Sequence, residues 1–284
     1  MTIKTTDEQL VKSFIAKLKL PGNNSHKGQN GKILIIGGSS LFHAASLWAA
    51  EVASHFCDMV HYSSTVENEK IFLSLKKKFR NGIVVPQAQI YDYANEDDTI
   101  LVGPGMMRDG DEGKYTLELT LNLIKKFPEK RFVFDAGALQ MMDPENLLLL
   151  KQTPIITPHQ NEFEKLFGIS VDKLSLTEKV KVAESTAKKY HSLILLKAIV
   201  DIVSDGHETY IIEGGNSGLT KGGTGDVLSS LCASFYTKNS PLISSLVSSI
   251  LLKKSAEELF YEKGYWYNVS DIINRLPRTL RSLI

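Results

Sequence analysis

Seven short, continuous apolar runs divide this chain, and they restrict its fold more than any other feature. The runs lie in KILIIGG, DMVHYSS, NGIVVPQ, TILVGPG, RFVFDAG, PIITPH and LILLK, each closed by glycine, proline or a polar residue. Segments of helical periodicity separate most of them, for example residues 44–56, 67–79, 112–127 and 176–189. Continuous apolar runs that alternate with helices indicate a mostly parallel sheet covered by helices on both faces. We therefore expect one α/β domain over residues 1–284.

The two ends of the chain carry elements outside this alternation. Residues 1–25 are predicted to form a short amphipathic helix and a loop rich in turn formers. The segments DIVSDG and ETYIIE have the spacing of an antiparallel hairpin that turns at Asp205–Gly206, which would lie at one edge of the sheet. Helical periodicity continues from Thr224 to about Tyr261, and a last short helix is predicted with Ser270 as its N-cap.

Charge and composition exclude several classes of protein. The 33 basic and 32 acidic residues give a net charge of +1, so the chain lacks the basic field of a nucleic-acid binder. No apolar run reaches the ~18 residues of a membrane span, and the first residues lack a secretory signal. The two cysteines, Cys57 and Cys232, lie in apolar helical patterns and are interpreted as buried small hydrophobes. A cytoplasmic protein is expected.

Five predicted strands end in residues that suit a ligand site. These are Gly37–Gly38, Gly103–Pro104–Gly105, Asp135, Thr157–Pro158–His159 and Lys197. In an open α/β sheet, ligands bind beyond the carboxyl ends of the strands. Glycine and proline also simply punctuate strands, which explains any one of these sites. The five together favour one shared crevice.

The segment GLTKGGTGDVLSSL, residues 218–231, places a glycine-rich turn directly before a predicted helix. The first N–H groups of a helix are unpaired and, with the helix dipole, attract anions. The turn suits a phosphate, yet Asp226 puts a carboxylate beside it. Asp226 either stabilises the helix start, or it takes a proton from a hydroxyl during phosphoryl transfer. Neither a Walker A motif nor a G-x-G-x-x-G fingerprint is present, so another phosphate-binding fold is indicated.

Several motifs, read together, resemble one family. GGTGDVL resembles the anion hole and catalytic aspartate of the ribokinase-like superfamily. HKGQNGKILIIGGS, ILVGPG, FDAGAL, TPHQNEFEKLFG, LLK and SDIINRLP occur in the order found in ADP-dependent NAD(P)H-hydrate dehydratases, between His26 and Pro277. The resemblance implies a three-layer α/β/α sandwich with a mostly parallel sheet.

The resemblance implies repair of NADH and NADPH hydrated on the nicotinamide ring, called NAD(P)HX. The ring hydroxyl would be phosphorylated by ADP or ATP with Mg²⁺, and loss of phosphate would restore the double bond. A homotetramer is typical of the family. The epimerase domain that is often fused to family members is not expected here, so a separate epimerase would cooperate with this chain.

The same resemblance implies roles for individual residues. Asp226 would be the catalytic base, and an anion hole would form from Gly223, Thr224 and Gly225. Substrate would contact Asp226 together with Ala44, Gly105 and His159. Nucleotide would contact Gly225 and Lys197, Ala198, Ile199, Val200, Asp201 and Asn216. Glu162 would help to hold Mg²⁺ through water, or it is simply an exposed charge at the start of a helix over residues 161–167.

Four positions depart from the family pattern. His43 stands where glycine is usual, and its side chain would crowd a bound pyrophosphate or hydrogen-bond to it. Gly137 replaces an aspartate. In the nucleotide segment a flexible residue and a hydroxyl have become Ala198 and Asp201, and an acid beside a phosphate weakens binding unless a cation compensates. Lys221 is the cation expected to compensate.

Two other functions stay open at this point. A small-molecule kinase of the same superfamily, acting on a vitamin-precursor alcohol, would use the same aspartate and anion hole, and fold does not separate the two. The changes in the nucleotide segment also allow a nucleotide-binding protein that has lost turnover. The intact GGTGD segment argues against that third possibility, because a pure binder needs no base.

Overall fold

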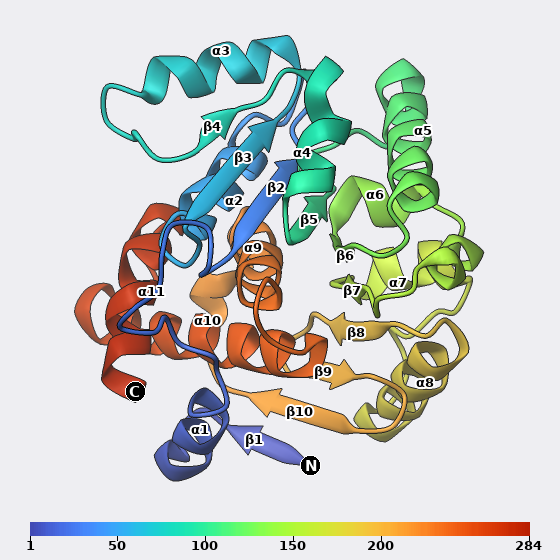
Figure 1. Cartoon of the computed structure of the whole chain (residues 1–284). Coiled ribbons are helices and arrows are strands. Elements are labelled where there is room, and N and C mark those ends of the chain that lie inside the picture. Colours follow the sequence, from blue (N-terminus) through green and yellow to red (C-terminus); the bar gives the residue numbers. More distant parts are fainter.

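One ten-stranded sheet runs through the computed structural model, which describes all 284 residues (Figure 1). The strand order is β1-β10-β9-β8-β7-β6-β5-β2-β3-β4. Each of the seven apolar runs contains a strand, from β2 to β8, and these seven strands are all parallel. The strands are β1 (Thr2–Lys4), β2 (Lys32–Ile36), β3 (Met59–Ser63), β4 (Ile83–Val84), β5 (Thr99–Val102), β6 (Arg131–Phe134), β7 (Ile155–Ile156), β8 (Leu193–Leu196), β9 (Asp201–Ser204) and β10 (Thr209–Glu213).

Helices connect the strands and cover both faces of the sheet. The α-helices are α1 (Glu8–Ile15), α2 (Ala44–Ala53), α3 (Val66–Leu75), α4 (Ile90–Glu96), α5 (Gly110–Lys126), α6 (Ala136–Met141), α7 (Gln160–Phe167), α8 (Leu176–Lys189), α9 (Thr224–Tyr236), α10 (Pro241–Lys263) and α11 (Val269–Leu283). Three short 3₁₀ helices are η1 (Gln87–Gln89), η2 (Pro144–Leu149) and η3 (Ser217–Thr220). None of the helices combines the length and apolarity that a membrane crossing requires.

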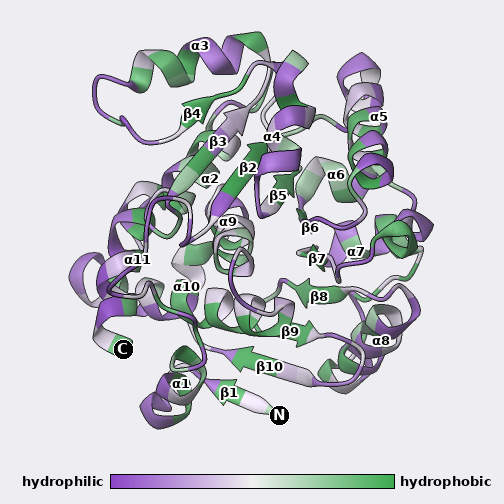
Figure 2. Ribbon diagram, viewed as in Figure 1, coloured by the Kyte–Doolittle hydropathy of each residue, from purple (hydrophilic) through white to green (hydrophobic).

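Two hydrophobic cores explain the layers. Successive strand residues point to opposite faces, so in β2 the side chains of Ile33 and Ile35 enter one core, while Leu34 and Ile36 enter the other. The first core packs against α1, α2, α9, α10 and α11, and the second against α4 to α8. Figure 2 shows hydrophobic colouring along the strands and mixed colouring on the outer helices. This arrangement confirms the predicted three-layer α/β/α class.

The local structure differs from the sequence-based expectation in three places. The helical stretch predicted from Thr224 is two helices, because the chain turns after Tyr236 and restarts at Pro241, with Ser240 as the N-cap. The N-cap predicted at Ser270 is wrong: Asn268 caps α11 and forms a reciprocal capping box with Asp271. The predicted hairpin of β9 and β10 is confirmed, but β1 pairs in parallel beyond it and forms the edge.

Both cysteines are free, and their surroundings favour the predicted structural role. Burial raises the pKa of Cys57 and of Cys232 to about 12, so both thiols stay protonated at neutral pH. Because the thiolate is the reactive form, neither residue is a candidate nucleophile.

Candidate active site

The carboxyl ends of the central parallel strands lie on the same side of the sheet, and an open cavity of about 800 Å³ lies beyond them. Its walls come from the loops that follow β2, β5, β6 and β7 and from the turn before α9. The residues predicted to contact substrate, Ala44, Gly105, His159 and Asp226, all line this cavity. Residues far apart in sequence thus meet in one crevice. Gly37–Gly38 instead line a second, smaller cavity, and Asp135 and Lys197 line neither of the two, so Gly105 and His159 are the predicted strand ends that reach this cavity.

The glycine-rich turn presents unpaired N–H groups to the cavity. Gly223 is the N-cap of α9 and has a φ of 105°, which favours glycine. The Thr224 hydroxyl donates to the carbonyl oxygens of Leu219 at 2.8 Å and Lys221 at 3.0 Å, which fixes the turn. The N–H groups of Gly223 and Gly225 find no main-chain acceptor in the protein, whereas the N–H of Thr224 lies 3.4 Å from the Lys221 carbonyl oxygen. Of these three residues, Gly223 lines the cavity. With the dipole of α9, these N–H groups are suited to bind an anion, as predicted for this turn.

Gly223→Ala tests this turn against a matched neighbour. A Cβ at Gly223 would overlap the indole ring of Trp48, and its φ is strained for any other residue. We expect this variant to lose at least ~10-fold in kcat/KM and ~1–3 kcal/mol of unfolding free energy. Gly222→Ala is the control, because a Cβ there meets nothing within 4 Å. Steady-state kinetics and urea unfolding measure both effects, and equal behaviour of the two variants would contradict the role of Gly223.

Asp226 is the carboxylate of the cavity that is poised to take a proton. It lies in the first turn of α9, and no other residue donates a hydrogen bond to its side chain. Burial raises the pKa of this carboxyl to about 7; Asp135 and Glu162 add to the rise, and Lys197 opposes it. A carboxyl whose pKa lies near neutrality is suited to general base catalysis.

Lys197, which directly follows β8, neutralises two buried carboxylates near the glycine turn. Its Nζ lies 2.8 Å from Oδ1 of Asp135 and 3.7 Å from Oε2 of Glu162. Burial alone would lower the pKa of the ammonium, but the two carboxylates outweigh it and raise the pKa above its usual value. The Nζ is also 3.4 Å from where a Cβ on Gly225 would be, so the cation sits beside the anion site.

His159 and Glu162 line the cavity and also cap α7. Nδ1 of His159 accepts hydrogen bonds from the N–H groups of Asn161 at 3.1 Å and Glu162 at 3.3 Å, which places the ring proton on Nε2. Oε2 of Glu162 accepts from the His159 N–H at 2.9 Å, and Oε1 accepts from Gln140 at 3.3 Å. Glu162 is therefore not the exposed charge considered as an alternative: it is 4% exposed. Half of the His159 side chain stays accessible.

The segment predicted to contact nucleotide, Lys197–Asp201, is a tight turn between β8 and β9 whose acid points inwards. Oδ1 of Asp201 accepts from the Ala198 N–H at 3.1 Å, and Oδ2 accepts from the Ser249 hydroxyl at 2.7 Å. Lys253 places its Nζ 3.5 Å from Oδ2 of Asp201 and donates to the Ile199 carbonyl oxygen at 3.1 Å. The buried Asp201–Lys253 pair therefore closes the turn.

Lys253, and not Lys221, neutralises Asp201, so the expectation for Lys221 is wrong. Lys221 donates instead to the main-chain oxygens of Gly218 and Tyr265. Because Asp201 is 5% exposed and paired, its charge does not project from the turn. What the turn presents to the exterior is Ile199, which is 92% exposed.

Asn216, which is also predicted to contact nucleotide, lies near Lys253 but does not line the 800 Å³ cavity. A Cβ on the preceding Gly215 would lie 3.3 Å from the Lys253 stem, so this turn packs on the lysine. The Asn216 side chain donates to the Ala256 carbonyl oxygen and accepts from the Tyr267 hydroxyl at 2.7 Å. Its amide is thus used by the protein, and Lys253 contacts Asp201, Ile199 and the neighbour of Asn216, Gly215.

Two of the departures from the family pattern have a physical explanation. His43 lines the cavity, but its Nδ1 lies 2.6 Å from Oδ1 of Asn68, so the ring is anchored to α3. A Cβ at Gly137 would overlap the carbonyl oxygen of Met106. An aspartate at Gly137 is therefore incompatible with the loop after β5 in this chain.

Sequence reasoning missed three residues of this region. Trp48 and Arg108 line the cavity: the indole packs on Gly223, and the guanidinium donates to Gln140 at 3.0 Å. Both lie outside any motif. The third is Lys253, and its only signal was a charge that follows the apolar run SSILL.

Sequence comparison finds one family over most of the chain. A profile described as NAD(P)H-hydrate dehydratase matches residues 33–278. The chain is 32% identical to the ADP-dependent (S)-NAD(P)H-hydrate dehydratase of Nitrosopumilus maritimus, with 99% of this chain and 98% of that relative covered. It is also 32% identical to the bifunctional NAD(P)H-hydrate repair enzyme Nnr of Methanocaldococcus jannaschii. That match covers 93% of this chain and 51% of the relative, so the chain spans about half of the relative's length.

Structural comparison finds the ribokinase-like fold. The ADP/ATP-dependent NAD(P)H-hydrate dehydratase from Bacillus subtilis, co-crystallised with ATP/Mg²⁺, superposes with a TM-score of 0.81 at 21% identity. The superposition covers 98% of this chain and 97% of that one. With the profile over most of its length and a relative aligned from end to end, this chain belongs to the NAD(P)H-hydrate dehydratase family of hydro-lyases.

Proposed function

We propose that this protein restores NADH and NADPH from NAD(P)HX, with ADP or ATP as the phosphoryl donor. One observation carries the proposal: Asp226, a carboxyl with a pKa of about 7, stands beside free N–H groups at a helix start on the wall of the 800 Å³ cavity. A base next to an anion site is the arrangement that phosphorylation of an alcohol requires.

The reaction follows from this arrangement in two stages. Asp226 accepts the proton of the ring hydroxyl. The oxygen of that hydroxyl bonds to the terminal phosphorus of the donor, and the phosphoanhydride P–O bond of the donor breaks. The N–H groups of Gly223, Thr224 and Gly225 stabilise the charge on the transferred phosphoryl group. The ring C–O bond then breaks, phosphate leaves with its electron pair, and a proton is lost from the neighbouring carbon. Phosphate replaces hydroxide, a poor leaving group, and the double bond is restored.

The other predicted residues position the two substrates in this proposal. Ala44, Gly105 and His159 contact the hydrated dinucleotide from the cavity wall. The donor lies against the turn Lys197–Asp201 and Asn216. Lys197 offsets the carboxylates of Asp135 and Glu162, which would otherwise repel the donor phosphates.

Magnesium would be held mainly by the donor. Nowhere do three His, Cys, Asp or Glu side chains gather to hold a metal ion. Mg²⁺ commonly keeps several waters and takes one or two carboxylates with substrate phosphates. Glu162 lines the cavity and would make such a contact through water. Bound Mg²⁺ would neutralise charge on the phosphates.

Incubation with NADHX, ADP and Mg²⁺ tests the proposal directly. We expect the absorbance band of the dihydronicotinamide to recover, with one AMP and one phosphate formed for each NADH. ATP in place of ADP identifies the preferred donor, and calorimetry gives the affinity for each. No recovery, together with a stable phosphate ester formed from a vitamin-precursor alcohol, would instead favour the small-molecule kinase. Binding without either reaction would favour the protein that has lost turnover.

The pH dependence of kcat/KM is expected to report Asp226. The pKa of this carboxyl is raised to about 7, and only its ionised form accepts a proton. The logarithm of kcat/KM should therefore fall with unit slope below about pH 7 and level off above it. Rate measurements over about 1.5 pH units on either side of this pKa check the expectation. A profile that stays flat down to about pH 5 would show that another group is the base.

We further propose a homotetramer in the cytoplasm, working with a separate NAD(P)HX epimerase. The bifunctional relative carries about as much chain again as the part matched here. With racemic NADHX, a purified epimerase added to this protein should roughly double the final yield of NADH, because it converts the epimer that is not consumed.

A further inference from the structure

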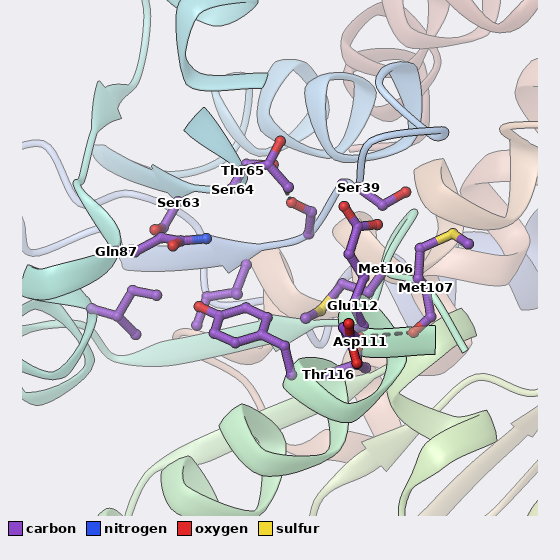
Figure 3. Close-up of a pocket in the computed structure, with 15 residues that line it drawn as sticks. Ser39, Ser63, Ser64, Thr65, Gln87, Met106, Met107, Asp111, Glu112 and Thr116 are labelled. Carbon is purple, nitrogen blue, oxygen red and sulfur yellow. Dashed lines mark hydrogen bonds between the residues drawn. The ribbon is translucent and has the colours of Figure 1, made fainter. Parts of the chain in front are cut away.

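A second cavity of about 310 Å³, drawn in Figure 3, shares lining residues with the active-site cavity. It lies where β2 and β3 end, and the first turns of α4 and α5 close it from the other side. Met106 and Met107 line both cavities. The two spaces also approach each other at Gly105, where a Cβ would lie 3.3 Å from the Cα of Gly38. Gly105 and Gly38 thus form a wall between the two spaces, and a ligand that occupied both cavities would pass over this wall beside Met106 and Met107.

The walls of the second cavity suit a flat, uncharged ring. Ile36, Ile90 and Met106 give it an apolar floor, and Tyr115 adds an aromatic side chain that is 39% exposed. Drug-sized ligands are held by this kind of apolar pocket with a few convergent polar groups.

The polar groups of the cavity are hydroxyls and amides. Ser63 is fully buried, and its Oγ has no hydrogen-bond partner in the protein. Buried hydroxyls are rarely left unpaired, so this atom points to a partner supplied by a ligand or water. Gln87 also lines the cavity, and Figure 3 shows it with Ser63, Ser64 and Thr65 around the same hollow. The Ser64 hydroxyl donates to the Gly37 carbonyl oxygen and the Thr65 hydroxyl accepts from the Asn68 N–H, so Ser63 and Gln87 are the groups left to pair with the ring nitrogens and the amino group of a base.

The charged residues that line the cavity disfavour a phosphate. Asp111 and Glu112 stand at its rim, and no lysine, arginine or histidine lines it. Asp111 is exposed and pairs with Lys114 at 3.0 Å, and Glu112 accepts hydrogen bonds from the N–H and the hydroxyl of Ser40. Carboxylates accept hydrogen bonds from sugar hydroxyls, whereas they repel a phosphate. The cavity thus fits a nucleoside, with its ribose hydroxyls towards the carboxylates.

We propose that this second cavity binds the adenosine end of NADHX while the hydrated ring lies at Asp226. The proposal rests on the proposed function, because the dinucleotide is the ligand long enough to occupy both cavities. It has a consequence for specificity: the additional ribose phosphate of NADPHX would face Asp111 and Glu112. The protein therefore prefers NADHX to NADPHX.

A cavity-filling variant and a truncated substrate test the binding of adenosine. Gln87→Trp narrows the cavity from its exposed rim, and Gln89→Trp is the matched control, exposed on the same short helix but outside the cavity. The truncated substrate is hydrated reduced nicotinamide mononucleotide, which lacks adenosine. We expect Gln87→Trp to raise KM for NADHX about 10-fold or more, without changing KM for the truncated substrate. Dihydronicotinamide fluorescence should show the same difference between the Kd of NADH and that of reduced nicotinamide mononucleotide.

Each other outcome has a definite meaning. Equal effects of Gln87→Trp on both substrates, or no effect on either, overturn the adenosine site. Failure of the wild type and of Gln89→Trp to convert NADHX at all overturns the proposed function instead, and the fluorescence titrations still decide whether adenosine enters the cavity.

A charge variant tests the preference between the two dinucleotides. Asp111→Asn combined with Glu112→Gln removes both charges while keeping the acceptor oxygens, and Glu118→Gln on the exposed side of α5 is the control. We expect the wild type to favour NADHX in kcat/KM, and the double variant to reduce that preference at least ~3-fold. A wild type that favours NADPHX, or an unchanged ratio in the double variant, overturns the specificity assignment.

Discussion

Replacement of Asp226 by asparagine is expected to lower kcat by roughly 10²- to 10⁴-fold, the range that removal of a general base commonly produces. Asparagine has nearly the same shape, so the turn before α9 should keep its form. The affinity for ADP should persist or rise, because a carboxylate beside the anion site repels phosphate. Steady-state kinetics and calorimetry measure the two effects, and the inflection of the pH profile near 7 should disappear from any residual rate.

A stability measurement separates this catalytic role from a structural one. The pKa of Asp226 is higher in the folded protein than its ordinary value of 3.8, so ionisation of this group disfavours folding as the pH rises from about 4 to about 7. Asp226→Asn should therefore unfold no more easily than the wild type at pH 8. Asp109→Asn, which removes another carboxylate from the same cavity, should retain most of the rate. Full activity in Asp226→Asn would show that the base is another group.

Lys253→Met is expected to be the most destabilising of these substitutions. Lys253 is 4% exposed and Asp201 is 5% exposed, and they lie 3.5 Å apart. Removal of one partner of a buried ion pair leaves an uncompensated charge, which costs about 3–5 kcal/mol. The turn Lys197–Asp201 also loses the hydrogen bond from Lys253 to Ile199. We therefore expect a lower urea midpoint and a raised KM for the phosphoryl donor.

The double variant Asp201→Thr/Lys253→Met provides the internal control. It removes both charges and restores the hydroxyl that is usual at residue 201, so it should recover most of the unfolding free energy lost in Lys253→Met. Lys254→Met, on the next residue, should change stability by less than about 1 kcal/mol, because its ion pair with Glu257 is partly exposed. If the double variant is as unstable as the sum of the single ones, the two residues are not coupled.

The parts of the site that follow one another along the chain were predictable from the sequence. Gly223 to Asp226 are consecutive, and a glycine turn before a helix fixes where its N–H groups and its first-turn acid lie. The strand-end positions of Gly105 and His159 likewise follow from the apolar runs before them. These two residues lie on the same side of the sheet because the strands that precede them are parallel.

The partners of buried charges were not predictable in this way. Asp201 was expected to meet Lys221, which is closer in sequence, but the lysine that reaches it is 52 residues away on α10. The dual use of His159, as a helix cap and a cavity wall, also depends on the packing of α7 against the sheet. Neither contact leaves a periodic pattern that a single sequence could show.

The order of apolar runs and glycine turns was enough to establish the α/β class, the parallel strands and a helix start with free N–H groups, because these depend on local geometry and on which faces must be buried. Folding in three dimensions was needed to establish the edge strand β1, the pKa of Asp226, the Asp201–Lys253 pair and the second cavity. Those properties depend on which side chains come together from distant parts of the chain, because burial and electrostatic interactions depend on distances in space and not on separation along the sequence.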